Sequence, residues 1–193
     1  EPEKSRQVQE PTGKLVVELG EGYKNKVYFN VSTKSVVKTV NPHSWDLAFQ
    51  CGPNEYGVLL NYANGTPYGY VINNLDFNRV TAAIVQDSTR IYDNVEGDVS
   101  KTVVGLWGKF EIGQKPESYK KTYVIDRGVD GITGEPLGMK KFQIYSFDPS
   151  NNTYFIKYAD LDNSNYHEAF ITKDPKFNYV YFSFLIQDLV DQE

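Results

Sequence analysis

Cysteine, methionine and histidine are scarce in this chain of 193 residues, which holds one Cys, one Met and two His. A single cysteine excludes a disulfide within one chain and a multi-cysteine metal site. Two histidines leave little material for general acid–base catalysis. The sequence also lacks the G-x-S-x-G, H-E-x-x-H and phosphate-loop motifs of common enzymes. These absences predict a protein that is not an enzyme.

An excess of basic residues and a long apolar run are missing as well. Acidic residues number 25 and basic residues 20, which gives a net charge of −5. With no Lys/Arg cluster, nucleic-acid binding is not expected. The longest apolar run, residues 179–186, is strand-sized and far shorter than the roughly 20 residues of a spanning helix. We therefore expect contact with a membrane only through a lipid anchor that this sequence does not contain.

Aromatic residues are abundant, with 15 Tyr, 11 Phe and two Trp. They favour strands, and alternating runs separated by turn residues recur about every ten residues. The pattern predicts an all-β single domain of antiparallel strands over residues 14–193, after a disordered tether at residues 1–13. One short helix is expected at residues 75–80, and residues 102–112 form an apolar segment interrupted by glycines. Strands are expected at residues 14–19, 26–31, 36–40, 45–51, 57–62, 68–72, 121–126, 141–147, 153–159, 167–172 and 177–186.

The segment 45–51 has the cleanest alternation in the chain. Trp45, Leu47, Phe49 and Cys51 share one face, which we expect to be buried. Cys51 is therefore interpreted as a structural thiol and not as a nucleophile.

Two further patterns carry structural predictions. Asn64-Gly65 separates residues 57–62 from 68–72, and this dipeptide predicts a hairpin because both residues accept positive φ. In residues 141–147 the alternation places Ile144 and Phe147 on opposite faces of a strand.

A calcium loop is the first candidate for a ligand site, because Asp160, Asp162 and Ser164 have the spacing of its first ligands. The pattern then fails, since Asn165 stands where glycine is needed and Ile171 where a bidentate Glu is needed. The segment is better interpreted as a polar turn.

Three side chains have the chemistry of an axial haem ligand: His43, His167 and Met139. Met139 ends a glycine-rich loop at residues 127–138, where it either points into a cleft or covers the core under that loop. His167 begins a predicted strand and is expected to be exposed, and His43 is expected in a turn.

Several segments, taken together and in order, resemble the HmuY family. The resemblance extends from about Lys14 to Ile186, and the Trp-Asp-Leu-Ala-Phe motif is its most specific part. The segments are Val27-Tyr28-Phe29, Val36-Val37, Ser44-Trp45-Asp46-Leu47-Ala48-Phe49, Lys140-Lys141-Phe142-Gln143-Ile144, Tyr154-Phe155-Ile156-Lys157-Tyr158-Ala159-Asp160-Leu161-Asp162 and Tyr179-Val180-Tyr181-Phe182-Ser183-Phe184.

The resemblance implies an exported lipoprotein on the outer membrane, or shed from it, of a Gram-negative anaerobe. Members of the family are almost all β. The best-known one grips haem between two hairpins through two histidines and passes it to a TonB-dependent receptor, and relatives use methionine. No histidine lies between residues 82 and 119, where the first of these hairpins is expected. The resemblance therefore places Met139 as one haem-binding residue, with Tyr92 or His167 as its partner.

The sequence thus predicts a non-enzymatic surface lipoprotein that binds haem or another porphyrin for uptake. The alternative is a surface lipoprotein of the same fold with a glycan or peptide ligand, or with a structural role.

Overall fold

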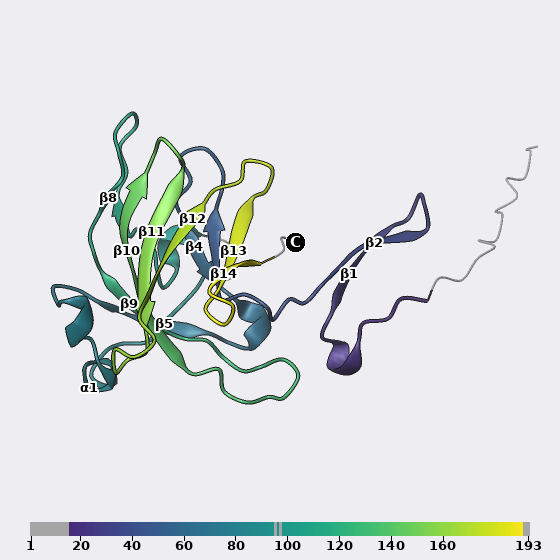
Figure 1. The fold of residues 1–193 in the computed structure, drawn as a ribbon, viewed down its shortest axis with the longest axis horizontal. Coiled ribbons are helices and arrows are strands. Elements are labelled where there is room, and N and C mark those ends of the chain that lie inside the picture. Colours follow the sequence, from purple (N-terminus) through teal and green to yellow (C-terminus); the bar gives the residue numbers. More distant parts are fainter. Residues whose placement is uncertain (1–15, 95, 97, 191–193) are drawn as a thin grey trace, which may run out of the picture.

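The fold is all-β, with every strand pair antiparallel and one short α-helix, as the sequence predicts. A computed structural model describes residues 16–94, 96 and 98–190 (Figure 1). The predicted tether at residues 1–13 lies outside the described residues. Within the described part of the chain, no helix is long and apolar enough to cross a membrane.

The larger sheet has six strands, and its core face is apolar in every long strand. Their order across the sheet is β12 (His167–Thr172), β11 (Thr153–Ala159), β10 (Met139–Asp148), β9 (Thr122–Asp126), β5 (Tyr68–Ile72) and β6 (Ile91–Tyr92). Side chains alternate between the two faces of a strand. Tyr123, Ile125, Phe142 and Ile144 therefore face one way, into the main core.

The smaller sheet has four strands and packs on the larger one. Their order is β14 (Asp188–Val190), β13 (Tyr179–Ser183), β3 (Leu47–Gln50) and β4 (Val58–Leu60). Leu47, Phe49, Val180 and Phe182 are fully buried and share one hydrophobic cluster with the core face of the six-stranded sheet. The two sheets thus enclose one core.

A β-bulge in β10 corrects one sequence prediction. The pairing with β11 passes from Ile144 to Ser146, which leaves Tyr145 without a partner. The extra residue returns Phe147 to the core face. Ile144 and Phe147 are therefore buried in the same cluster, and the predicted strict alternation is wrong at this point.

The second face of the six-stranded sheet is covered by two short helical segments. The helix predicted at residues 75–80 is displaced, because η3 (Phe77–Arg79) ends at Val80, whose backbone is extended, and α1 (Ala82–Gln86) begins after it. Val80 and Val85 are buried with Tyr70, Ile72 and Val124 in a second hydrophobic cluster.

The remaining elements are short. They are η1 (Glu21–Tyr23), β1 (Lys26–Asn30), β2 (Ser35–Val40), η2 (Tyr62–Asn64), η4 (Val99–Lys101), β7 (Gly108–Lys109) and β8 (Glu117–Ser118). β1 and β2 pair with each other alone and project from the body of the molecule (Figure 1). Residues 16–19 form no strand, contrary to prediction, and of residues 102–112 only β7 is one.

The hairpin predicted at Asn64-Gly65 is wrong. β4 pairs with β3 in the smaller sheet, whereas β5 pairs with β9 and β6 in the larger one. The chain crosses between the sheets through η2, whose first turn is capped by the Asn61 side chain. Gly65 does adopt positive φ, at 106°, but it ends this 3-10 turn.

Trp45 is half-buried, although the alternation predicts a buried side chain. Leu47, Phe49 and Cys51 are buried as expected. On the opposite face Asp46 and Ala48 are also buried, and Asp46 is held there by Arg127 and by the Phe184 backbone N–H.

Candidate ligand-binding site

Four side chains lie in one row across the six-stranded sheet. Met139 of β10 is opposite Asp126 of β9, Asp126 is opposite Tyr68 of β5, and Tyr68 is opposite Tyr92 of β6. Residues directly opposite each other in antiparallel strands project from the same face. This face is the one covered by α1, so the row brings two of the sequence-predicted residues, Met139 and Tyr92, to one surface.

An arginine ties the tyrosines of this face together. The Arg90 guanidinium lies 4.4 Å from the centre of the Tyr68 ring, and its Nε donates to the Tyr70 hydroxyl at 3.3 Å. The Tyr68 ring is 5.8 Å from that of Tyr70 and 5.9 Å from that of Tyr92. Arg90 and Tyr92 are exposed, so a cation and an aromatic face are available to a ligand.

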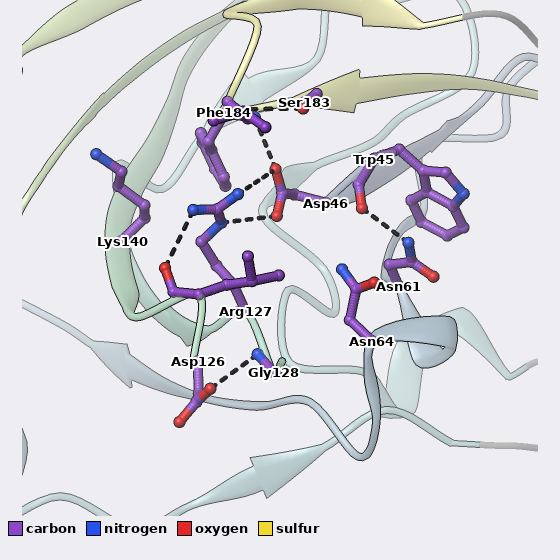
Figure 2. A network of polar contacts seen from close by, with 12 residues as sticks. Trp45, Asp46, Asn61, Asn64, Asp126, Arg127, Gly128, Lys140, Ser183 and Phe184 are labelled. Carbon is purple, nitrogen blue, oxygen red and sulfur yellow. Dashed lines mark hydrogen bonds and ion pairs between the residues drawn. The ribbon is translucent and has the colours of Figure 1, made fainter. Parts of the chain in front are cut away.

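The Tyr68 hydroxyl is held in its neutral form. Burial, together with a hydrogen bond to the neighbouring Asp126 carboxylate, raises the pKa of Tyr68 to about 12. A phenol is a ligand or nucleophile mainly as phenolate, so Tyr68 acts at neutral pH as a ring and a hydrogen-bond donor. Asp126 also accepts from the Gly128 backbone N–H at 2.9 Å, which fixes its carboxylate (Figure 2).

A cavity of about 430 Å³ opens beside this row, and we call it the tyrosine hollow. Its walls include Tyr70, Val85, Arg90, Met139 and Leu161. Its volume falls in the range of about 300 to 1,000 Å³ that is typical of small-molecule sites. Gln86 and Ser88 also line the cavity. Walls that are largely apolar, with one cation, suit a flat apolar ligand that carries an anionic group.

The sequence left open whether Met139 points into a cleft or covers the core, and in the structure it does both. It is half-buried against the second hydrophobic cluster, and it lines both the tyrosine hollow and an adjoining shallow one of about 700 Å³. The second hollow also carries Asp160 and Asp162, which belong to a tight turn and are hydrogen-bonded to Ser164. The polar turn predicted there is confirmed.

His167 lies on the opposite face of the sheet from Met139. It is opposite Tyr158, which is opposite Phe142, and both of these residues belong to the main core. Phe142 and Met139 are three positions apart on β10 and therefore project from opposite faces. The His167 ring stacks on Tyr158 at 5.5 Å and is half-buried. The structure does not bring His167 and Met139 together.

His43 stands apart from both. It lies in a turn, as predicted, and its Nδ1 is 3.1 Å from the side-chain oxygen of Asn64. Within the described residues, no group of three His, Cys, Asp or Glu side chains is placed to hold a metal ion.

Sequence reasoning missed Arg90, Tyr68 and Asp126. Tyr68 and Tyr70 are two positions apart, as are Arg90 and Tyr92, which is the spacing of one strand face. That spacing could have predicted that Tyr68 lies on the same face as Tyr70. The approach of β6 to β5 joins distant segments, and no local pattern predicts it.

A buried ion pair fixes the loop that leads into Met139. Arg127 donates from Nε to Asp46 Oδ1 at 2.7 Å and from Nη2 to Oδ2 at 3.3 Å (Figure 2). Asp46 also accepts from the Phe184 backbone N–H at 2.7 Å, and Arg127 donates to the Leu137 carbonyl at 3.1 Å. One carboxylate thus joins the smaller sheet to the first residue after β9 and, through Leu137, to the approach to β10.

Comparisons with known proteins return no match: no family model, no curated protein and no solved structure is similar to this chain. The resemblance to the HmuY family therefore stays a prediction from the sequence.

Proposed function

We propose that the protein is a non-enzymatic binding protein for haem or another porphyrin, and that the tyrosine hollow is its site. The observation that carries the proposal is that Met139 and Arg90 line one largely apolar cavity, while Tyr92 lies on the same face of the sheet, outside the cavity lining. A porphyrin is a flat apolar ring with carboxylate side chains. The thioether of Met139 can bind its metal, the guanidinium of Arg90 can pair with its carboxylates, and the ring of Tyr92 can pack on its face.

The order of the row assigns the roles. Tyr68 and Asp126 stand between Met139 and Tyr92. We therefore assign Met139 as the iron ligand, and Tyr92 as a ring contact and not as the opposite axial ligand. Arg90 is exposed beside both tyrosines and pairs with a carboxylate of the porphyrin. Haem, when bound, supplies a redox-active iron, and the soft thioether of Met139 favours its ferrous state.

The wider biology remains a set of predictions from the family resemblance. These are an outer-membrane or secreted location, a lipid anchor, and delivery of haem to a TonB-dependent receptor. The absence of nucleic-acid binding is a separate prediction from the acidic composition.

A haemin titration tests the proposal. We expect a shifted Soret band on mixing and tighter binding after reduction with dithionite. Met139→Leu, which keeps the apolar volume, should weaken ferrous binding by about tenfold or more, a change of about 1.4 kcal/mol or more. His167→Ala is the matched control, because that side chain projects from the opposite face of the sheet.

The outcomes are distinct. No Soret shift in either oxidation state contradicts haem binding. A shift that Met139→Leu leaves unchanged contradicts the assignment of the ligand, and loss of binding in His167→Ala instead moves the site to the other face.

A further inference from the structure

A second cavity lies at the other end of β10 from the tyrosine hollow. It has a volume of about 750 Å³ and is formed by the loops that follow β3, β7, β10 and β12. We call it the loop hollow. The loops after β10 and β12 lie together at the upper end of the molecule in Figure 1. Nothing in the proposed porphyrin site uses this cavity.

A buried ammonium group lines the loop hollow. Lys173 is 8% exposed, and its Nζ donates to the backbone carbonyls of Gly52, at 3.2 Å, and Glu55. The ring of Tyr56 lies 4.3 Å from the same nitrogen. An ammonium group has three N–H donors, so two carbonyls leave one donor without a hydrogen-bond acceptor among the described residues.

Lys173 also has no carboxylate partner in the part of the chain that the structure describes. No Asp or Glu oxygen lies within 4 Å of its Nζ, and neither Glu55 nor Asp174 lines the hollow with its side chain. Burial of a charge is costly unless the charge is paired. An anion in the cavity would supply the missing counter-charge and the missing acceptor together.

The charged side chains that line the loop hollow are both basic, and the Glu55 carboxylate, outside the lining, offsets only part of the effect of burial on the pKa of Lys173. Acidic residues outnumber basic ones in the chain, 25 to 20, yet no Asp or Glu lines this cavity, whereas Lys115 and Lys173 do. Both lysines thus favour an anion, Lys173 from a buried position and Lys115 from an exposed one.

Aromatic rings form part of the apolar lining of the same cavity, together with three prolines and Cys51. Tyr56, Phe147 and Phe177 all line the cavity. Tyr56 is held in place by a stacked contact with Phe110 at 4.7 Å and an edge contact with Phe147 at 5.3 Å. Fixed rings beside a buried cation suit a ligand with an apolar or aromatic body and one acidic group.

We propose that the loop hollow is a second binding site, which takes an organic carboxylate with an aromatic or apolar body and pairs its carboxylate with Lys173. Such a carboxylate belongs either to a free small molecule or to the C-terminus of a peptide. The ligand and the site differ from those of the porphyrin proposal, and neither depends on the other.

Phenylacetate and phenylacetamide test the proposal as a matched pair, because they share a shape and differ in charge. Trp107 donates from Nε1 to the Tyr56 carbonyl at 2.8 Å, so its fluorescence reports on the wall of the hollow. A Trp45→Phe background makes Trp107 the only tryptophan, and excitation at the red edge of the absorption band selects its emission over that of the tyrosines. We expect phenylacetate to bind at least about tenfold more tightly than the amide, since a hydrogen bond to a charged group contributes about 1.5 to 3 kcal/mol.

Lys173→Met should remove this preference. Lys157→Met is the matched control, because it makes the same change in net charge at a residue that does not line the loop hollow. Asn54→Asp places a carboxylate on the exposed rim of the cavity and should also weaken phenylacetate binding. This variant leaves the core untouched, so it tests the proposal even if Lys173→Met unfolds.

Equal binding of acid and amide overturns the proposal, and so does unchanged binding of the acid in Asn54→Asp. The peptide N-acetyl-Ala-Phe, as the free acid and as the amide, distinguishes a peptide C-terminus from a free small carboxylate as the ligand. A free acid that binds more tightly than phenylacetate indicates a peptide C-terminus. Weaker binding of that peptide indicates a small carboxylate.

Discussion

Two lysines are buried in the part of the chain that the structure describes, and they differ in the number of hydrogen-bond acceptors around them. The Lys141 ammonium is fully buried under η3, where it donates to the carbonyls of Phe77 at 3.1 Å and Val80 at 2.8 Å and to Asn163 Oδ1 at 2.6 Å. Lys173 has two carbonyl acceptors and a cavity beside it. Three acceptors use every donor of an ammonium group, whereas two do not.

The difference separates a structural cation from one that is open to a ligand. Lys141 holds the η3 turn and the loop after β11 onto the sheet, and it has no donor left for another molecule. Lys173 holds the loop after β3 and keeps one donor beside the loop hollow. Burial alone therefore does not indicate function, and the count of acceptors around the buried charge is more informative.

Among these charged groups, the Asp46–Arg127 pair should show the largest loss of stability on mutation, because both of its side chains are charged and little exposed. Asp46→Ala would leave Arg127 without its counter-charge and the Phe184 N–H without an acceptor. We expect the free energy of unfolding to fall by about 4 kcal/mol, as when one partner of a buried pair is removed. Urea denaturation measures it, and a loss below about 1 kcal/mol would show that the pair is solvated.

Urea denaturation should also show a larger loss of stability for substitution of Lys141 than for substitution of Lys173. Lys141→Met leaves the two buried carbonyls of Phe77 and Val80 without a donor and should cost about 3 kcal/mol. Lys173→Met should cost about 1 kcal/mol, because water in the cavity can reach the freed carbonyls. Equal losses would remove the distinction between them. A larger loss at Lys173 would make it the structural residue of the two.

The pH dependence of stability provides the smallest expected effect. Burial lowers the pKa of Lys173 in the folded state from its usual value of 10.5. A lowered folded-state pKa destabilises the fold while the amine is charged, and this penalty disappears as pH rises from the folded value to 10.5. The wild type should therefore gain stability relative to Lys173→Met over that range. Urea midpoints of both proteins between pH 8 and about 10.5 check the sign, and a constant difference contradicts a shifted pKa.

Sequence patterns predicted the C-terminal half of the fold best. The predicted strands 153–159 and 167–172 coincide with β11 and β12, because each has strong β propensity and is bounded by polar turns. These signals are local, and neighbouring strands there pair with one another. In the N-terminal half the strand 68–72 was also correct, but its partner was wrong, since partner choice depends on segments far along the chain.

The residues of the two candidate sites also differ in how far the sequence predicted them. Met139 was identified from its residue type and its place after a glycine-rich loop, and Tyr92 was identified from the resemblance to the HmuY family. The sheet places both on one face. Lys173 gave no signal, because a lysine in a Lys-Asp-Pro-Lys turn normally faces solvent. Its burial is caused by the loop after β3, more than 100 residues away, whose carbonyls it binds.

The β1–β2 hairpin has a consequence for how the protein exchanges its amide hydrogens with solvent. Each of its strands has one neighbour, and Val31, Val36 and Val37 are exposed beside them. A two-stranded ribbon is marginally stable by itself in water, and regions with few buried contacts open far more often than a core does. Deuterium should therefore enter β1 and β2 early, while the central part of β10, which has a neighbouring strand on each side and is buried from Lys141 to Ile144, exchanges last.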